Sequence, residues 1–107
     1  YIDMVRERAR LIRSMDDRIA DVDVLAWPTT PVVAPTMQEV AAPDEFARKN
    51  AMLLRNTVIV NFFDLCAISV PIPRGSGLPA GFMLVARNGQ DQRLFRIAAA
   101  IERLFAA

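Results

Sequence analysis

The chain has 107 residues, with 13 basic and 12 acidic side chains and a formal net charge of +1. This near balance argues against a nucleic-acid-binding module, which would carry a clear basic excess, and a hydrophobic fraction of 53% argues against a disordered chain. The sequence has no histidine and a single cysteine, Cys66, so it forms no histidine-based site and no internal disulfide. The length suits one small domain, and no apolar run approaches the roughly 20 residues that a membrane-spanning helix needs.

The first predicted helix runs from Asp3 to about Ile19. Apolar residues recur there at three- and four-residue steps, as one face of an α-helix requires: Ile2, Val5, Ala9, Ile12, Met15 and Ile19. Arginines and acids interleave on the opposite side, which favours a solvated surface over a phosphate-binding stripe. We expect two local ion pairs on that surface: Glu7 with Arg10, and Arg13 with Asp17.

A short apolar segment, Asp23 to Trp27, predicts a buried strand that ends at Pro28. The segment that follows is rich in proline, which removes backbone donors and biases preceding residues towards extended geometry, so it is not helical. Thr29 and Thr30 are therefore held as a rigid polar lip at the end of the strand. Two interpretations stay open: the hydroxyls satisfy local backbone groups in a turn, or they line the wall of a pocket.

A second helix is predicted from Pro43 to about Thr57, because proline followed by two acidic residues is typical of a helix N-terminus. The β-branched residues at 58–60 weaken the helical pattern. We therefore expect a short further helix or an irregular buried connection between them and Asp64.

Two further buried strands are predicted, Leu65 to Val70, which Pro71 ends, and Gly81 to Ala86. The eight-residue loop between them is rich in glycine and proline, which predicts an antiparallel pair. Both strands are apolar at nearly every position. We therefore expect both of their faces to be covered, as in the middle of a layered sheet.

The last predicted helix runs from Gln92 to Phe105, with Asp91 as its N-cap. Together the elements predict an α/β fold, a fragment of a mixed layered sheet with about three strands and three helices. The apolar stripe of the last helix is expected to pack on the sheet: Leu94, Ile97, Ala98, Ile101, Leu104 and Phe105.

Several phrases follow one another in a recognisable order. Pro-Thr-Thr-Pro follows the first strand, Ala-Ile-Ser-Val-Pro closes the second, and Leu-Pro-Ala-Gly opens the third before the closing helix. Their order and spacing resemble the C-terminal end of an amidase signature family enzyme. The resemblance covers nearly the whole chain and implies one C-terminal segment, residues 1–107, that is incomplete without the rest of the amidase core. The start at Tyr1 in mid-pattern also predicts a piece of a longer protein.

The resemblance implies hydrolysis of carboxylic amide C–N bonds. Family members use a serine nucleophile, a second serine with an unusual cis peptide and a lysine general base, and they pass through an acyl-enzyme. These residues lie in an earlier Gly/Ser-rich core, whereas this chain has three serines and one lysine, none in such a run. We therefore assign no catalytic residue, cofactor or metal to this chain and predict that it is inactive alone.

The resemblance also leads us to expect four polar residues nearest the substrate pocket: Thr29, Thr30, Asn61 and Asp64. They lie at a predicted strand end or a helix-to-strand junction, where α/β sheets meet ligands. The expected partners are the missing N-terminal catalytic portion and, in the full enzyme, a small amide substrate. A role in an amidotransferase stays open, because a glutamine-hydrolysing subunit can share this fold. The single cysteine fits a reducing cytoplasm.

Three other features of the sequence could indicate a nucleotide-binding loop, a Ser–Lys catalytic pair or a reactive thiol, and each is disfavoured. Gly75 to Ala80 fits the dinucleotide pattern G-x-G-x-x-(G or A), but a predicted strand follows where a helix is required. A Ser–Lys pair of Ser69 with Lys49 is disfavoured, because Lys49 is expected on a solvated helix face. Cys66 lies in an apolar strand, which favours a buried, inert thiol.

A competing hypothesis is a non-catalytic interaction module. Two strands that are apolar on both faces need more cover than three helices supply. The isolated chain is therefore expected to form a homodimer or a larger assembly, with strand exchange as one route. Neither a nucleic acid nor a membrane is expected as a partner.

Overall fold

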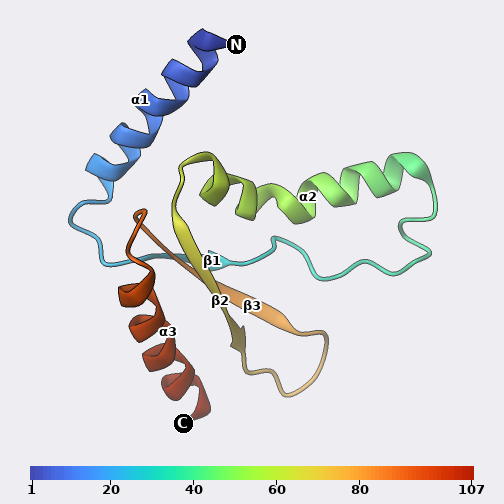
Figure 1. The fold of residues 1–107 in the computed structure, drawn as a ribbon. Helices are drawn as coiled ribbons and strands as arrows, with labels where there is room; N and C mark the ends of the chain where they lie inside the picture. Colours follow the sequence, from blue (N-terminus) through green and yellow to red (C-terminus); the bar gives the residue numbers. More distant parts are fainter.

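The computed structural model describes residues 1–107 as one three-stranded sheet with three helices (Figure 1). The strand β3 lies between β1 and β2 and pairs antiparallel with both. The predicted α/β fold class and the predicted antiparallel pair are thereby confirmed. The elements follow in the order α1 Ile2–Arg18, β1 Leu25–Pro28, α2 Pro43–Phe62, β2 Cys66–Ile72, β3 Ala80–Ala86 and α3 Asp91–Ala106.

The central position of β3 follows from its side chains, which are apolar on both faces. Met83, Leu84, Val85 and Ala86 are all buried. Because successive side chains of a strand point to opposite faces, Met83 and Val85 contribute to one core and Leu84 and Ala86 to another. One strand therefore supplies both layers of the molecule.

The larger core lies between the sheet and α3. Leu94 and Ala98 of α3 are buried there against Val70, Leu84 and Ala86. Figure 1 shows α3 running along this side of the sheet, with the C-terminus beyond it. The predicted stripe of this helix is confirmed at these positions.

One predicted member of that stripe is wrong, because Leu104 is 68% exposed. A second correction concerns the start of the helix. Asp91 is its first residue and Gln90 is the N-cap, with no capping side-chain hydrogen bond. The carboxylate of Asp91 still complements the positive end of the helix dipole from the first turn.

The smaller core lies on the opposite face, where Val60 of α2 packs with Met83 and Val85. The helix α2 continues to Phe62, so the predicted end near Thr57 is wrong. The intrinsic penalty of β-branched residues in a helix is at most about 0.7 kcal/mol each. Burial of Val60 against the sheet is worth more, about 1.5–3 kcal/mol.

The strand β2 extends through Pro71 to Ile72 and does not end at Val70 as predicted. Pro71 pairs with Gly81 on β3. It is tolerated because β2 is an edge strand, where the missing N–H of a proline costs no ladder hydrogen bond if it faces outwards.

Much of the apolar surface of the chain has no cover. No residue of α1 is buried, and Val60 is the one buried residue of α2. The accessible surface is 7825 Å², whereas a compact monomer of this mass exposes about 5,900 Å². The molecule is a plate of 44 × 42 × 17 Å, and α1 and the start of α2 reach away from the sheet (Figure 1).

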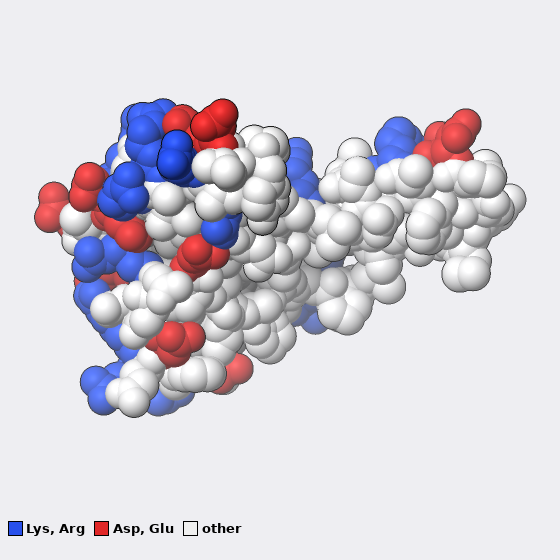
Figure 2. Space-filling view, turned by 45° about the horizontal axis from the view of Figure 1, so that its top comes forward, with Lys and Arg blue, Asp and Glu red and all other residues white.

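Figure 2 shows most of the charged side chains in that view over the broad end of the molecule. The projecting arm, formed by the loop 29–42 and the first half of α2, shows acidic and basic side chains near its tip and is otherwise uncharged in this view. We expected the strands β2 and β3 to be covered on both faces. This holds for β3 but is wrong for β2. Ala67, Ser69 and Pro71 are exposed on one face of β2, because α2 meets that side of the sheet only around Val60.

Ion pairs decorate the exposed helix surfaces. The predicted pair of Glu7 with Arg10 forms at 2.5 Å, and the hydrogen bond from Arg10 holds the pKa of the Glu7 carboxyl below its usual value. The predicted pair of Arg13 with Asp17 does not form. Exposed pairs of this kind add little to stability. None of the three helices combines the length and apolar character needed to cross a bilayer.

Leu94 and Leu104 compare the side of α3 that packs on the sheet with the side that is exposed. We expect Leu94→Ala to lower the free energy of unfolding by about 2–5 kcal/mol, because it removes a buried side chain. Leu104→Ala is the matched control and should change it by less than about 0.5 kcal/mol, because that side chain is exposed. Urea unfolding followed by circular dichroism measures both. Equal losses for the two variants would contradict the packing of α3.

Candidate functional site

The four expected pocket residues lie at opposite ends of the sheet. Thr29 and Thr30 follow β1, whereas Asn61 is in the last turn of α2 and Asp64 precedes β2. Because β1 and β2 are both antiparallel to β3, they run in the same direction. A residue after β1 and a residue before β2 are therefore separated by the length of a strand, and the structure does not bring the two pairs together.

Thr29 is the centre of a polar cluster on the face of the sheet that α2 leaves open. Its Oγ1 lies 2.5 Å from the Oγ of Ser69, so one hydroxyl donates to the other. Its backbone N–H donates to the carbonyl oxygen of Gly81 at 2.9 Å. The cluster thus joins all three strands at one end of the sheet.

Gly81 makes this cluster possible by having no side chain. A Cβ at this position would lie 2.5 Å from Thr29 Oγ1 and closer still to Ser69 Oγ. Both contacts are shorter than real Cβ atoms tolerate, so the two hydroxyls occupy the space that any other residue would fill. Sequence reasoning singled out Ser69 only as a partner for Lys49. The alternation of side chains along β2 places it on the Thr29 face, which becomes visible only once the register is known.

Two further contacts fix the backbone at this end of the sheet. Asn56 of α2 donates from Nδ2 to the carbonyl oxygen of Pro28 at 2.7 Å, which fastens the helix to the end of β1. The hydroxyl of Thr30 donates to the carbonyl oxygen of Val32 at 2.9 Å. Thr30 therefore satisfies a local turn, whereas the Thr29 hydroxyl contacts a different strand.

Trp27 precedes this cluster on the same face of β1. Its ring packs against the core formed by Val60, Met83 and Val85. The indole Nε1–H is buried and has no hydrogen-bond partner within the chain. An unpaired buried donor of this kind costs about 1–3 kcal/mol. An acceptor that reached the indole N–H would therefore stabilise this face of the sheet.

At the opposite end, Asp64 is engaged in structural contacts. Arg8 of α1 forms an ion pair with the Asp64 carboxylate and donates to the carbonyl oxygen of Asn61 at 3.2 Å. Asp64 has a positive φ of 53°, a conformation in which aspartate is among the tolerated residues. Asn88 donates to the Asp64 carbonyl oxygen at 2.8 Å. Asp64 therefore joins α1, the α2–β2 junction and the turn after β3.

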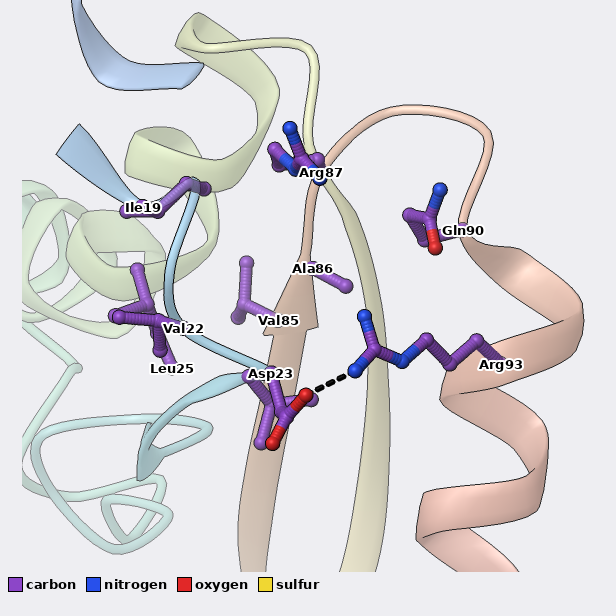
Figure 3. Close-up of a pocket in the computed structure, with 10 residues that line it drawn as sticks. Ile19, Val22, Asp23, Leu25, Val85, Ala86, Arg87, Gln90 and Arg93 are labelled. Carbon is purple, nitrogen blue, oxygen red and sulfur yellow. Dashed lines mark hydrogen bonds and ion pairs between the residues drawn. The ribbon is translucent and has the colours of Figure 1, made fainter. Parts of the chain in front are cut away.

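Figure 3 shows a close-up of one small hollow. It lies between the α1–β1 connection, the end of β3 and the start of α3, and an ion pair of Asp23 with Arg93 spans its mouth. Its volume is about 10 Å³, which is room for about one water molecule. This hollow cannot hold an amide substrate. We take the Thr29–Ser69 cluster as the candidate site, because it brings two hydroxyls together on the open face of the sheet.

Substitution of Gly81 tests the geometry of this cluster. Gly81→Ala should lower the free energy of unfolding by about 1–3 kcal/mol, because the new methyl group overlaps two hydroxyls. Ser69→Ala in the same chain should recover part of that loss, since it removes the closer contact. Gly75→Ala is the control, because nothing lies within 4 Å of its Cβ position. Urea denaturation of these variants and the parent chain gives the answer, and a Gly81→Ala variant as stable as Gly75→Ala would refute the arrangement.

Comparison with known proteins identifies related sequences. A profile of the amidase family matches residues 1–95. The chain is 35% identical over 85 residues to 2-amino-5-chloromuconic acid deaminase of Comamonas testosteroni, covering 78% of this chain and 18% of the relative. It is 37% identical over 97 residues to the A subunit of glutamyl-tRNA(Gln) amidotransferase of Halobacterium salinarum, covering 90% of this chain and 22% of the relative.

A solved structure gives the same result in three dimensions. The crystal structure of the A subunit of glutamyl-tRNA(Gln) amidotransferase from Thermotoga maritima matches with a TM-score of 0.75 and 29% identity, over 96% of this chain and 22% of that one. The chain thus spans about a fifth of the length of the relatives it matches. Sequence profile, pairwise identity and fold agree, and the chain belongs to the amidase family.

Proposed function

We propose that residues 1–107 are the C-terminal structural part of a hydrolase that cleaves carboxylic amide C–N bonds through a serine acyl-enzyme. The observation that carries this proposal is the family match over residues 1–95. The solved relative supports it, because its similar fold occupies only 22% of a longer chain. In this proposal the reacting serines and the lysine belong to an N-terminal catalytic portion, which is the partner of these residues.

The distribution of nucleophiles supports a scaffold role. The three serines lie on three separate parts of the chain: Ser14 in α1, Ser69 in β2 and Ser76 in the loop before β3. The hydroxyl of Ser69 is hydrogen-bonded to Thr29 and not to the amine of Lys49, which lies in the projecting part of α2. A serine nucleophile needs an adjacent base, and none of these three has one.

We propose that Thr29 and Thr30 form one wall of the substrate pocket in the whole enzyme. Thr29 is the better placed of the two, because its hydroxyl pair with Ser69 leaves one O–H free to donate to an oxygen of the substrate. Asn61 and Asp64 would border a different part of the same enzyme, at the other end of the sheet.

A second candidate is the amidotransferase branch of the family. Several relatives are named as the A subunit of glutamyl-tRNA(Gln) amidotransferase, one of them 37% identical to this chain. On this alternative the amide that is hydrolysed is glutamine, and the ammonia is passed to a second substrate. Assay of the natural gene product with free glutamine and with simple aliphatic or aromatic amides separates the two candidates.

Activity should depend on sequence outside these residues. We expect the purified 107-residue chain to show no amide hydrolysis, because it lacks a serine with an adjacent base. We expect the natural polypeptide that contains it to release ammonia from an amide, measured by a coupled ammonia assay. Hydrolysis by the short chain, lost on Ser69→Ala, would overturn the proposal.

The pocket assignment is tested in the natural polypeptide by Thr29→Val. Loss of one hydroxyl contact should lower kcat/KM about 3- to 10-fold, equivalent to about 0.5–1.5 kcal/mol. Thr30→Val tests the other half of the same wall. Thr36→Val is the matched control, because its hydroxyl contacts Glu39 in the loop and not the sheet. Unchanged turnover and unchanged KM in both Thr29→Val and Thr30→Val would contradict the proposal that the pocket wall lies at this end of the sheet.

A further inference from the structure

The hydroxyl pair of Thr29 and Ser69 has one unused donor. A hydroxyl carries one O–H and can accept two hydrogen bonds. The two oxygens lie 2.5 Å apart, and either could be the donor. Neither side chain forms another hydrogen bond within the chain, so one O–H is used inside the pair and the other is free. The residue that carries the free O–H is the one that can donate to a substrate.

The surroundings of Thr29 fix its hydroxyl in place. Its backbone N–H donates to the carbonyl oxygen of Gly81 at 2.9 Å, and the preceding carbonyl oxygen, that of Pro28, accepts from Asn56 at 2.7 Å. Threonine is β-branched, which restricts rotation about χ1. The residue is also half-buried. The Thr29 oxygen therefore has a fixed position beside the central strand.

Ser69 is the more accessible and the more adaptable partner. It lies in the middle of β2, on the part of the face that α2 leaves open, and it is exposed together with Ala67 and Pro71. Serine lacks the γ-methyl group of threonine, so its hydroxyl can turn among three staggered rotamers. The Ser69 oxygen can therefore accept from Thr29 while its own O–H points away from the sheet.

The difference in burial sets the direction of the hydrogen bond within the pair. A polar group removed from water without a partner costs free energy, whereas an exposed group bonds to water. If Thr29 donates to Ser69, the half-buried proton has a partner and the exposed O–H of Ser69 is solvated. The reverse direction would leave the proton of Thr29 without a partner. The favoured arrangement therefore presents the O–H of Ser69 on the open face.

The strand residues around this exposed hydroxyl are uncharged. Ala67 and Pro71 flank it on β2, and Gly81 lies beside it on β3. The nearest arginine along the chain, Arg74, donates to the carbonyl oxygen of Leu78 within its own loop. Charged donors bind carboxylates more strongly than neutral ones do. A single neutral donor on an uncharged surface therefore suits a neutral acceptor such as a carbonyl oxygen.

From these features we infer that Ser69 donates a hydrogen bond to a carbonyl oxygen of the amide substrate, and that Thr29 is a positioning residue that holds this hydroxyl. The inference rests on the proposed function, and Ser69 thereby joins Thr29 and Thr30 in the proposed wall. Ser69 has no part in bond cleavage, since no base is adjacent to it. Its contact is made with substrate and transition state alike, so its loss should raise KM and leave kcat unchanged.

Kinetics of the natural polypeptide test this contact. Ser69→Ala should raise KM for an amide about 3- to 10-fold and leave kcat within about twofold, because one hydrogen bond to the substrate is lost. Ser69→Thr keeps a hydroxyl at this position and should restore most of the affinity. Ser14→Ala is the matched control, because that serine lies in α1 and not in the sheet. An unchanged KM in Ser69→Ala, or an equal loss in Ser69→Thr, overturns the inference.

The positioning role of Thr29 is tested by combining substitutions. If Thr29 acts through Ser69, Thr29→Val should raise KM no further in a polypeptide that already carries Ser69→Ala. Thr29→Ser retains the donor and should stay close to the parent polypeptide. Effects that multiply to about 10- to 100-fold in the double variant identify two independent contacts. That result overturns the assignment of Thr29 as a positioning residue.

Neutron diffraction from deuterated crystals of the natural polypeptide gives the direction of the hydrogen bond without any measurement of activity. The deuterium between the two oxygens should be bonded to Thr29 Oγ1, and the deuterium of Ser69 should point away from the sheet. A deuterium bonded to Ser69 Oγ and directed at Thr29 overturns the inference. An amide hydrolase that fails these tests refutes the inference alone. The expected deuterium positions in a polypeptide without amide hydrolysis refute the proposed function alone.

Discussion

The arrangement of this chain depends on the pairing of β3 with two strands that are distant in the sequence. β1 and β2 are separated by about 40 residues, and they come together because both bond to the strand Ala80–Ala86. That strand also supplies the buried side chains of both cores. Loss of β3 would separate α3 from α2 and divide the molecule into parts too small to bury an apolar side.

The same pairing explains why a glycine and two hydroxyls meet at one end of the sheet. The register places Thr29 and Ser69 on either side of Gly81, on the face opposite α3. The two hydroxyls occupy the position of a Cβ on the central strand, and only glycine leaves that space. Thr29 is the first residue after β1, and its N–H continues the hydrogen-bond ladder to Gly81, so the sheet fixes the position of the cluster as a wall for a substrate requires.

The number, order and type of the elements could be predicted from the sequence, because hydrophobic periodicity and proline punctuation are local signals. Prediction failed where tertiary contacts decide. Burial of Val60 extends α2 beyond the β-branched run, and the free edge of β2 allows the strand to pass through Pro71. The pocket prediction grouped Thr29 with Asp64 because both flank strands. Only the sheet order shows that one follows its strand and the other precedes its strand, which places them at opposite ends.

The weak attachment of α1 bears on how this segment contributes to a hydrolase. The helix has no buried residue, and its contacts with α2 and the junction after it include the exposed ion pair of Arg8 with Asp64 and the stacking of Arg8 over Phe62. Such contacts contribute little free energy, so its position must be stabilised mainly by whatever covers its apolar stripe. A partner that binds only the folded arrangement stabilises it by mass action. Substitutions on these uncovered faces would then reduce amide hydrolysis by weakening assembly, with the chemistry of the reacting groups unchanged.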